Sequence, residues 1–164
     1  MKTTAKVFAT LFALAAGGSL AFPAESSPAA AAPAPAAPAT FEITVNDAAM
    51  KFSIAKIAAH PGQTLTIKLK NNGAQPKDVM GHNWVLLKAD TDTDAYTATA
   101  SASKSEGFEP KALAAQVIAA IPLLGPGQSG EVTFTCPATP GTYNYLCTFP
   151  AHAMLGMKGV LIVK

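Results

Sequence analysis

The segment Cys147–Gly159, CTFPAHAMLGMKG, places one cysteine, one histidine and two methionines within thirteen residues, just before the last apolar stretch of the chain. These side chains offer a thiolate, an imidazole and two thioethers, all of which bind metals, and the thiolate is also a nucleophile. Three kinds of chemistry follow from this composition. They are a cysteine nucleophile activated by histidine, a disulfide bond, and a metal centre.

The first two alternatives use the sulfur of Cys147 without a metal. A cysteine hydrolase needs a third residue that orients the histidine, and Asn83 is the available candidate. A disulfide would pair Cys147 with Cys136, the only other cysteine, and composition alone favours it in an exported domain. Either arrangement would withdraw the sulfur from metal binding.

A metal centre needs a second imidazole from elsewhere in the chain. His82, in VMGHNWVL, stands at the start of an apolar stretch, whereas a Pro-Gly turn follows His60, where a solvent-facing histidine is expected. Zinc accepts one thiolate and two imidazoles, but a methionine thioether is a poor fourth ligand for it. Copper suits two histidines and a cysteine in a plane with a distant methionine. The set His82, Cys147, His152 and Met157 is therefore compatible with a copper site that exchanges one electron.

The elements that must position these residues are predicted to be short strands. Apolar and polar residues alternate strictly in Phe41–Val45 and Thr64–Lys70. Further strands are predicted at Asn83–Leu87, Val117–Ile121, Glu131–Thr135, Tyr143–Cys147 and Gly159–Lys164. Turn signals rich in glycine, proline and asparagine separate them, without alternating helices. This pattern predicts an all-β protein, an antiparallel β-sandwich of seven to eight strands.

The segment Lys88–Gln116 breaks the pattern because it is polar and rich in small residues. It predicts a short helix capped by Asp92 or Asp94. The spacing of Asp90 and these two aspartates is similar to that of a calcium loop. However, no glycine stands at the sixth position, and Ser101 occupies the place of the bidentate glutamate. We therefore interpret the aspartates as solvated residues near a helix start.

The N-terminal forty residues differ from the rest of the chain. Residues 1–21 combine two lysines, a ten-residue apolar run and a small-residue end, which is typical of a secretory signal peptide. Residues 22–40 form an Ala/Pro-rich linker, and residues 41–164 are predicted to form one domain. The protein is expected to be exported to the periplasm. The alternative is tethering to the outer face of a membrane through an uncleaved N-terminus.

Charge and histidine content exclude several classes of function. The predicted domain has ten lysines, no arginine and nine acidic residues, so it has no concentrated basic face for nucleic acid. The chain has only three histidines, too few for the additional copper clusters of a multicopper oxidase or nitrite reductase. We expect neither an enzyme nor a protein that binds a small-molecule substrate.

The motifs VMGHNWVL and CTFPAH...MKG resemble those of the azurin/auracyanin-like blue (type 1) copper proteins of the cupredoxin family. The resemblance implies a Greek-key β-sandwich with a short helical insertion and one copper ion that alternates between Cu(I) and Cu(II). It implies His82, Cys147 and His152 as in-plane ligands, Met157 as the axial ligand and a weak carbonyl contact from Gly81. Four residues separate His152 from Met157, a spacing similar to auracyanin and plastocyanin rather than azurin.

The same resemblance implies what the protein does. It is expected to carry single electrons between larger redox proteins as a monomer, with the outer edge of His152 as the electron exit. A transient donor and acceptor would dock on an apolar patch around that histidine, formed by Met80, Pro150, Ala151, Met154 and Leu155. The alternative is a copper-binding delivery or storage module, which favours exposed methionine and histidine tracts.

Three further expectations concern residues other than the copper ligands. Backbone N–H groups near Asn83 and Phe149 are expected to bond the sulfur of Cys147, and the Asn83 side chain to join the two ligand loops near Thr148. Cys136 has no counterpart in the resemblance, and a bond to Cys147 would consume the metal thiolate. We therefore predict that Cys136 is a free, partly buried thiol.

Overall fold

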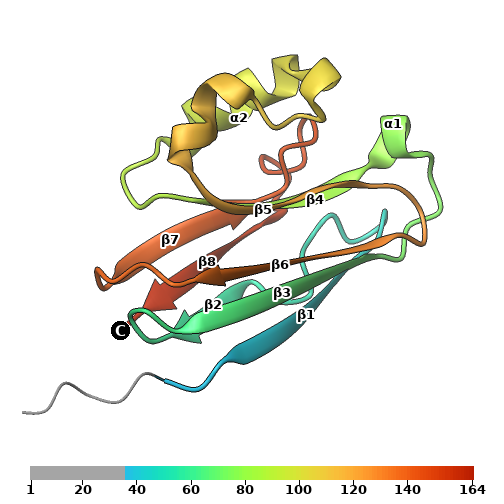
Figure 1. The fold of residues 1–164 in the computed structure, drawn as a ribbon. Helices are drawn as coiled ribbons and strands as arrows, with labels where there is room; N and C mark the ends of the chain where they lie inside the picture. Colours follow the sequence, from blue (N-terminus) through green and yellow to red (C-terminus); the bar gives the residue numbers. More distant parts are fainter. Residues whose placement is uncertain (1–35) are drawn as a thin grey trace, which may run out of the picture. The chain divides into compact units, whose positions relative to one another are not determined.

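The computed structural model describes residues 36–164, which form two β-sheets enclosing a common apolar core (Figure 1). One sheet has three strands in the order β1-β3-β6, and the other has five in the order β2-β8-β7-β4-β5. The strands and helices are β1 (Ala39–Val45), β2 (Lys56–Ala59), β3 (Thr64–Asn71), α1 (Lys77–Met80), β4 (His82–Leu87), α2 (Thr93–Ala102), η1 (Lys104–Glu106), η2 (Lys111–Gln116), β5 (Val117–Leu124), β6 (Ser129–Thr135), β7 (Gly141–Leu146) and β8 (Lys158–Val163). The predicted sandwich is confirmed. The predicted signal peptide and most of the predicted linker lie outside the described residues.

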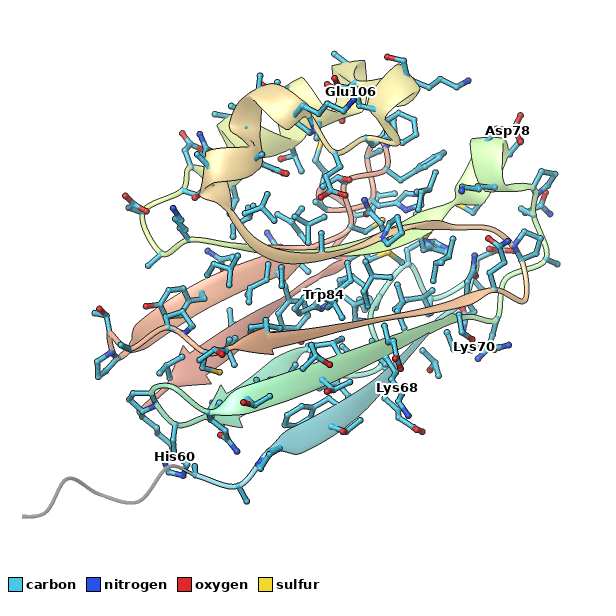
Figure 2. The ribbon with its side chains drawn as sticks, viewed as in Figure 1. His60, Lys68, Lys70, Asp78, Trp84 and Glu106 are labelled. Carbon is cyan, nitrogen blue, oxygen red and sulfur yellow. The ribbon has the colours of Figure 1, made fainter. Side chains whose placement is uncertain are left out.

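The core lies between the two sheets, as strand alternation predicted. On β3, the inward-facing residues are fully buried, namely Leu65, Ile67 and Leu69. Lys68 and Lys70 alternate with them on the solvent side, while Trp84 lies between the sheets (Figure 2). The Trp84 ring packs against Tyr145 of β7 and Phe134 of β6, with ring centroids 5.3 and 6.2 Å apart. The indole therefore connects the strand that carries His82 to both sheets.

Two strand pairs differ from the antiparallel prediction. β1 runs parallel to β3, and β2 runs parallel to β8, whereas the remaining pairs are antiparallel. Between β1 and β3 the chain crosses to the other sheet to form β2. Turn motifs in the sequence indicate hairpins between consecutive strands. They do not indicate which strands pair after the chain crosses to the other sheet. β2 itself was not predicted, because four residues are too few to establish a period.

The helical insertion covers the outer face of the five-stranded sheet. Tyr96 and Ala100 of α2 are buried against Val85 and Leu87 of β4. Since the other face of β4 lies on the main core, all six residues of this strand are buried. A strand covered on both faces reads as a continuous apolar run rather than an alternating one.

The predicted helix begins after one of the two predicted caps. Asp92 Oδ1 accepts hydrogen bonds from the backbone N–H groups of Asp94 and Ala95, both at 3.0 Å. This N-cap uses a carboxylate that a calcium loop would need as a ligand. Within the described part of the chain, no helix has the length and apolarity required to cross a membrane.

Candidate metal centre

Three residues from separate segments bring their ligand atoms together at one end of β4. His82 opens β4, Cys147 directly follows β7, and His152 lies in the loop that leads to β8. Their ligand atoms all lie within 4.8 Å of one another, and all three residues are buried. Cys147 Sγ lies 3.4 Å from His152 Nδ1. The structure therefore brings together the three residues predicted as in-plane ligands.

Backbone hydrogen bonds fold the loop from Cys147 to Met157 back on itself. The N–H of Cys147 donates to the carbonyl of Met157 at 3.1 Å, and the N–H of Met157 donates to the carbonyl of His152 at 2.9 Å. Met157 is fully buried, whereas the Met154 side chain is 86% exposed. Of the two methionines in the loop, only Met157 is enclosed with the cysteine and histidine.

The start of β4 is shaped by a bulge and a close backbone approach. His82 pairs with Leu124 and Trp84 pairs with Ile121, so β5 has one more residue than β4 in this interval. Such bulges re-aim side chains beside functional sites. A Cβ at Gly81 would lie 2.5 Å from the carbonyl oxygen of Lys77 and 2.8 Å from Leu123 Cγ, so a side chain does not fit there. The carbonyl contact from Gly81 to the metal stays a prediction.

A pair of hydrogen bonds joins β4 to the loop. Asn83 Nδ2 donates to Thr148 Oγ1 at 2.6 Å, and the backbone N–H of Thr148 donates to Asn83 Oδ1 at 2.7 Å. Both residues are fully buried. The predicted link between the two ligand segments is confirmed. Because the Asn83 amide is bonded to Thr148, it is engaged away from the orienting role that a cysteine hydrolase would give it.

Burial sets the protonation of the candidate ligands. It raises the pKa of the Cys147 thiol to about 11, against the opposing effect of the Asn83 and Phe149 backbone N–H groups, which bond the sulfur. Burial also lowers the pKa of His152 to about 4, and repulsion from His82 adds to this. At neutral pH both imidazoles are therefore neutral, and a metal has to displace one proton, that of the thiol.

The polar atoms of His82 support occupation by a metal. Neither ring nitrogen of this buried histidine has a hydrogen-bond partner, and burial without a partner is costly for a polar group. Burial lowers the pKa of His82, which keeps a nitrogen lone pair available. A soft sulfur ligand beside two neutral imidazoles, with a buried thioether in the same loop, fits copper.

His152 is more enclosed than predicted. Only 2% of it is exposed, whereas its outer edge was expected at the surface. The ring of Phe149 lies 4.7 Å from the imidazole, centroid to centroid, and Phe108 from the helical insertion packs edge-on against Phe149 at 5.0 Å. Among the predicted patch residues, Ala151, Met154 and Leu155 are exposed, and Met80 and Pro150 are half-buried. The apolar patch therefore lies beside the histidine rather than around an open ring edge.

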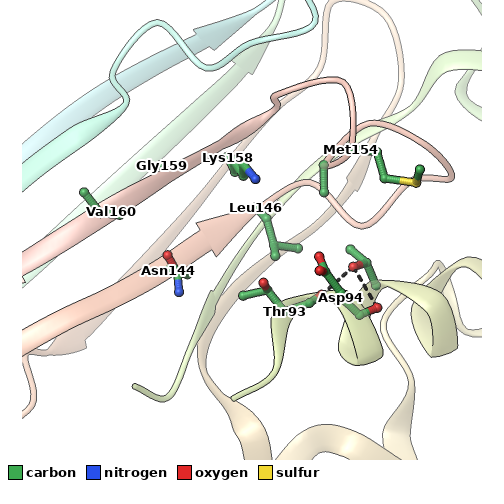
Figure 3. Close-up of a pocket in the computed structure, with 10 residues that line it drawn as sticks. Thr93, Asp94, Asn144, Leu146, Met154, Lys158, Gly159 and Val160 are labelled. Atoms are coloured by element: carbon green, nitrogen blue, oxygen red, sulfur yellow. Dashed lines mark hydrogen bonds between the residues drawn. The ribbon is translucent and has the colours of Figure 1, made fainter. Parts of the chain in front are cut away.

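A cavity of about 220 Å³ lies between the first turn of α2 and strands β7 and β8 (Figure 3). Thr93, Asp94, Asn144 and Lys158 contribute to its lining, and Met154 of the loop lies at one side. His82, Cys147 and His152 do not line it. The cavity is therefore separate from the candidate metal centre.

One residue near the centre was missed by sequence reasoning. Asp47 follows β1, and its Oδ1 lies 3.7 Å from Nε2 of His82. In the sequence it is a single aspartate after a strand, which is indistinguishable from an ordinary turn residue. Only the parallel pairing of β1 with β3, itself unpredicted, brings this strand end into place.

The remaining histidine and cysteine lie outside the centre. His60 is exposed, and its Nδ1 lies 3.1 Å from the backbone oxygen of Lys164, so the preference for His82 is supported (Figure 2). Both cysteines of the chain are free. Cys136 is 3% exposed, and burial raises the pKa of its thiol. The prediction of a free thiol is confirmed, and the thiol is more deeply buried than expected.

Comparisons with known proteins agree with this geometry. A family model described as copper binding proteins, plastocyanin/azurin family, matches residues 39–164. Auracyanin-A of Chloroflexus aurantiacus is 36% identical over 127 residues, which cover 76% of this chain and 74% of that protein. Azurin of Pseudomonas chlororaphis is 37% identical over 104 residues, covering 62% of this chain and 80% of that protein. The solved structure of auracyanin A, described as a "blue" copper protein, superposes with a TM-score of 0.67 at 37% identity, covering 77% of this chain and 99% of that one.

Proposed function

This chain belongs to the plastocyanin/azurin family of copper-binding proteins, and from that premise we propose that it carries single electrons between larger redox proteins. The observation that carries the proposal is the convergence of three buried ligand atoms within 4.8 Å of one another. Bound copper supplies a one-electron couple between Cu(I) and Cu(II). The surrounding residues decide how little the site rearranges when the electron arrives or leaves.

We assign His82, Cys147, His152 and Met157 as the side chains that would hold the copper ion, with Gly81 as a residue whose carbonyl would make a weak contact. The first four side chains are between 0% and 2% exposed, so they exclude water from the metal. The two hydrogen bonds between Asn83 and Thr148 hold the segments that carry the ligands together. The same fixed ligand set then serves both oxidation states.

Burial of the ligands favours electron transfer over the alternatives. A hydrolase needs a substrate cavity at its nucleophile, and the cavity beside the loop has neither Cys147 nor His152 in its lining. A delivery or storage module needs ligands that a partner can reach and exchange. A closed centre prevents such exchange, while an electron can still leave through the protein.

Docking of redox partners is assigned to the apolar surface beside His152. Met154 and Leu155 are 86% and 61% exposed on the loop that carries this ligand. A small apolar surface suits a brief encounter rather than permanent assembly. We therefore propose a monomer that meets its donor and acceptor in turn through this loop.

Export is proposed from the sequence of the N-terminal segment. Residues 1–21 are assigned as a secretory signal peptide. The predicted linker of residues 22–40 is assigned as far as residue 38, because β1 already begins at Ala39. The protein is then delivered to the periplasm. The intact mass of protein recovered from the periplasmic fraction tests this directly, because cleavage near residue 21 removes a defined mass and an uncleaved tether does not.

The function is tested by loading the metal-free protein with Cu(II). We expect an intense visible band that ascorbate bleaches, and a reversible one-electron wave in voltammetry. Transfer of the metal to a chelator should be slow compared with electron exchange. Rapid release of copper without a reversible wave would contradict electron transfer and favour delivery or storage.

A further inference from the structure

The carboxylate of Asp47 is held beside His82 by backbone groups of a neighbouring loop. Asp47 Oδ2 accepts hydrogen bonds from the N–H groups of Ala74 at 2.7 Å and Gln75 at 3.2 Å. An aspartate carboxylate is an anion at neutral pH. These two bonds fix the carboxylate and leave its second oxygen beside Nε2 of His82.

That second oxygen and the nearest ring nitrogen are both unsatisfied. Asp47 Oδ1 and His82 Nε2 are buried, neither has a hydrogen-bond partner, and they lie 3.7 Å apart. This separation is longer than an ordinary hydrogen bond of about 2.7–3.2 Å. One atom is an anionic acceptor, and the other is a donor whenever it carries the ring proton. Each is therefore the complementary partner that the other lacks.

The loop opposite Asp47 is shaped to leave room for this carboxylate. A Cβ at Gly73 would overlap Asp47 Oδ1 and would lie 2.8 Å from Asp47 Cγ. The N–H of Gly73 donates to Asn71 Oδ1 at 2.8 Å, which holds the glycine in this position. Gly73 is thus needed for space, and any side chain at this position would push the carboxylate away.

We propose that Asp47 is a positioning residue for the copper ligand His82, and that its Oδ1 accepts a hydrogen bond from Nε2–H of His82 when the metal is bound. Metal-binding histidines generally donate their second ring N–H to such a partner, which fixes the tautomer and makes the imidazole a stronger ligand. With the proton held on Nε2, Nδ1 is left for the metal. This inference rests on the proposed copper site, and it adds a residue that the ligand motifs do not contain.

The proposal has a direct consequence for the reduction potential. A negative charge next to a ligand, and a more basic imidazole, both favour Cu(II) over Cu(I) because the oxidised ion carries the larger charge. Asp47 therefore lowers the potential of the centre. Loss of its charge, or displacement of the carboxylate from His82, should raise the potential.

The experiment compares the reduction potentials of the copper-loaded wild type, Asp47→Asn and Gly73→Ala by voltammetry. Asp90→Asn is the matched control, because it removes one exposed carboxylate beyond the opposite end of β4. We expect a more positive potential for Asp47→Asn and Gly73→Ala, and no change for Asp90→Asn. Gly73→Ala keeps the charge of Asp47, so it separates contact with His82 from net charge.

Nuclear magnetic resonance of the reduced, diamagnetic protein gives a second readout. We expect a slowly exchanging Nε2–H proton of His82 in the wild type and faster exchange in Asp47→Asn and Gly73→Ala. Equal potentials and equal exchange rates in the wild type and Asp47→Asn would overturn the role of Asp47. Absence of the blue band in the wild type would instead refute the copper site itself, so the two failures are distinguishable.

Discussion

At the scale of single residues, the protonation of Cys147 governs how the site takes up copper. Burial raises the pKa of this thiol to about 11 and lowers that of His152 to about 4. At pH 7 the sulfur therefore carries a proton, while the imidazole does not. Copper binds the thiolate, so loading has to release the thiol proton.

We predict that Cu(II) loading at pH 7 releases about one proton per ion. Calorimetry in buffers of different ionisation enthalpy measures this number directly. Cys136→Ser should release the same number, because Cys136 lies outside the metal centre. Release of no proton would show that the thiol is already ionised in the metal-free protein, contrary to its burial.

His152 makes the stability of the metal-free protein depend on pH. The fold lowers the pKa of His152 from 6.5 to about 4. Between these two pH values the unfolded chain binds a proton at His152 and the folded chain does not. The free energy of unfolding should therefore fall as the pH drops from 6.5 towards 4. At about 1.4 kcal/mol per pKa unit, the loss is on the order of 3 kcal/mol.

Urea denaturation at several pH values between 4 and 7, in the presence of a chelator, tests this dependence. His152→Gln should make the profile shallower, because it removes one of the two buried histidines whose pKa the fold lowers. His60→Gln changes an exposed histidine and should leave the profile as it is in the wild type. An equally steep profile in His152→Gln would assign the pH dependence to other groups.

Asn83 stabilises the fold through its two hydrogen bonds with Thr148. Its amide bonds both the hydroxyl and the backbone N–H of that buried residue. Asn83→Ala leaves both groups without a partner, and each costs about 1–3 kcal/mol. We predict that the free energy of unfolding of the metal-free protein falls by about 2–4 kcal/mol, measured in urea. A loss below 0.5 kcal/mol would show that this link is not a major support of the fold.

At the scale of elements, α2 depends on its N-cap. Asp92 satisfies two backbone N–H groups at the start of the helix. Asp92→Ala should therefore lower the free energy of unfolding by about 1 kcal/mol. Asp90→Ala, which removes an exposed aspartate before the helix, should change it by less than about 0.5 kcal/mol. Equal effects of the two substitutions would contradict the capping role.

The elements that were predictable from sequence are those with a strong local pattern. The alternation in β3 and the cap of α2 are both local, and both were found within a residue or two. β2 is too short to show a period, and its parallel pairing with β8 depends on contacts a hundred residues apart in sequence. Pairing of this kind is decided by the whole fold, so local turn signals do not contain it.

Some residues of the candidate site could likewise be predicted from the sequence, and others could not. Cys147, His152 and Met157 share one loop, and His82 carries its own motif, so residue types and spacing, together with the family resemblance, were sufficient to propose them as ligands. Asp47 was not found, because its relation to His82 exists only after β1 pairs with β3. The covering of His152 likewise depends on side chains from the helical insertion, whose path the sequence did not reveal.

At the scale of the whole molecule, the proposed docking of partners depends on the nearly neutral charge and on the exposed loop. The full chain has a formal net charge of +2, so long-range steering is weak. Under the proposed function, contact through Met154 and Leu155, both largely exposed, is expected to govern the encounter with partners. Electron self-exchange between two copies is a convenient measure of this surface, because each molecule presents the same loop.

We predict that Met154→Lys slows electron self-exchange several-fold, because it places like charges in the encounter surface. Its rate should rise with ionic strength as the repulsion is screened, whereas the wild-type rate should change little. Thr133→Lys on β6, away from the loop, is the matched control and should exchange at nearly the wild-type rate. Line broadening in mixtures of reduced and oxidised protein measures these rates. Equal rates for Met154→Lys and the wild type would place the electron exit elsewhere.

The central claim is that folding joins His82 to the sulfur of Cys147 and the imidazole of His152 around one copper ion. The most direct measurement is the visible absorption of copper-loaded protein in the wild type, Cys147→Ser and Cys136→Ser. We expect an intense blue band in the wild type and in Cys136→Ser, and its loss in Cys147→Ser. A blue band that survives in Cys147→Ser would contradict this account of the metal centre.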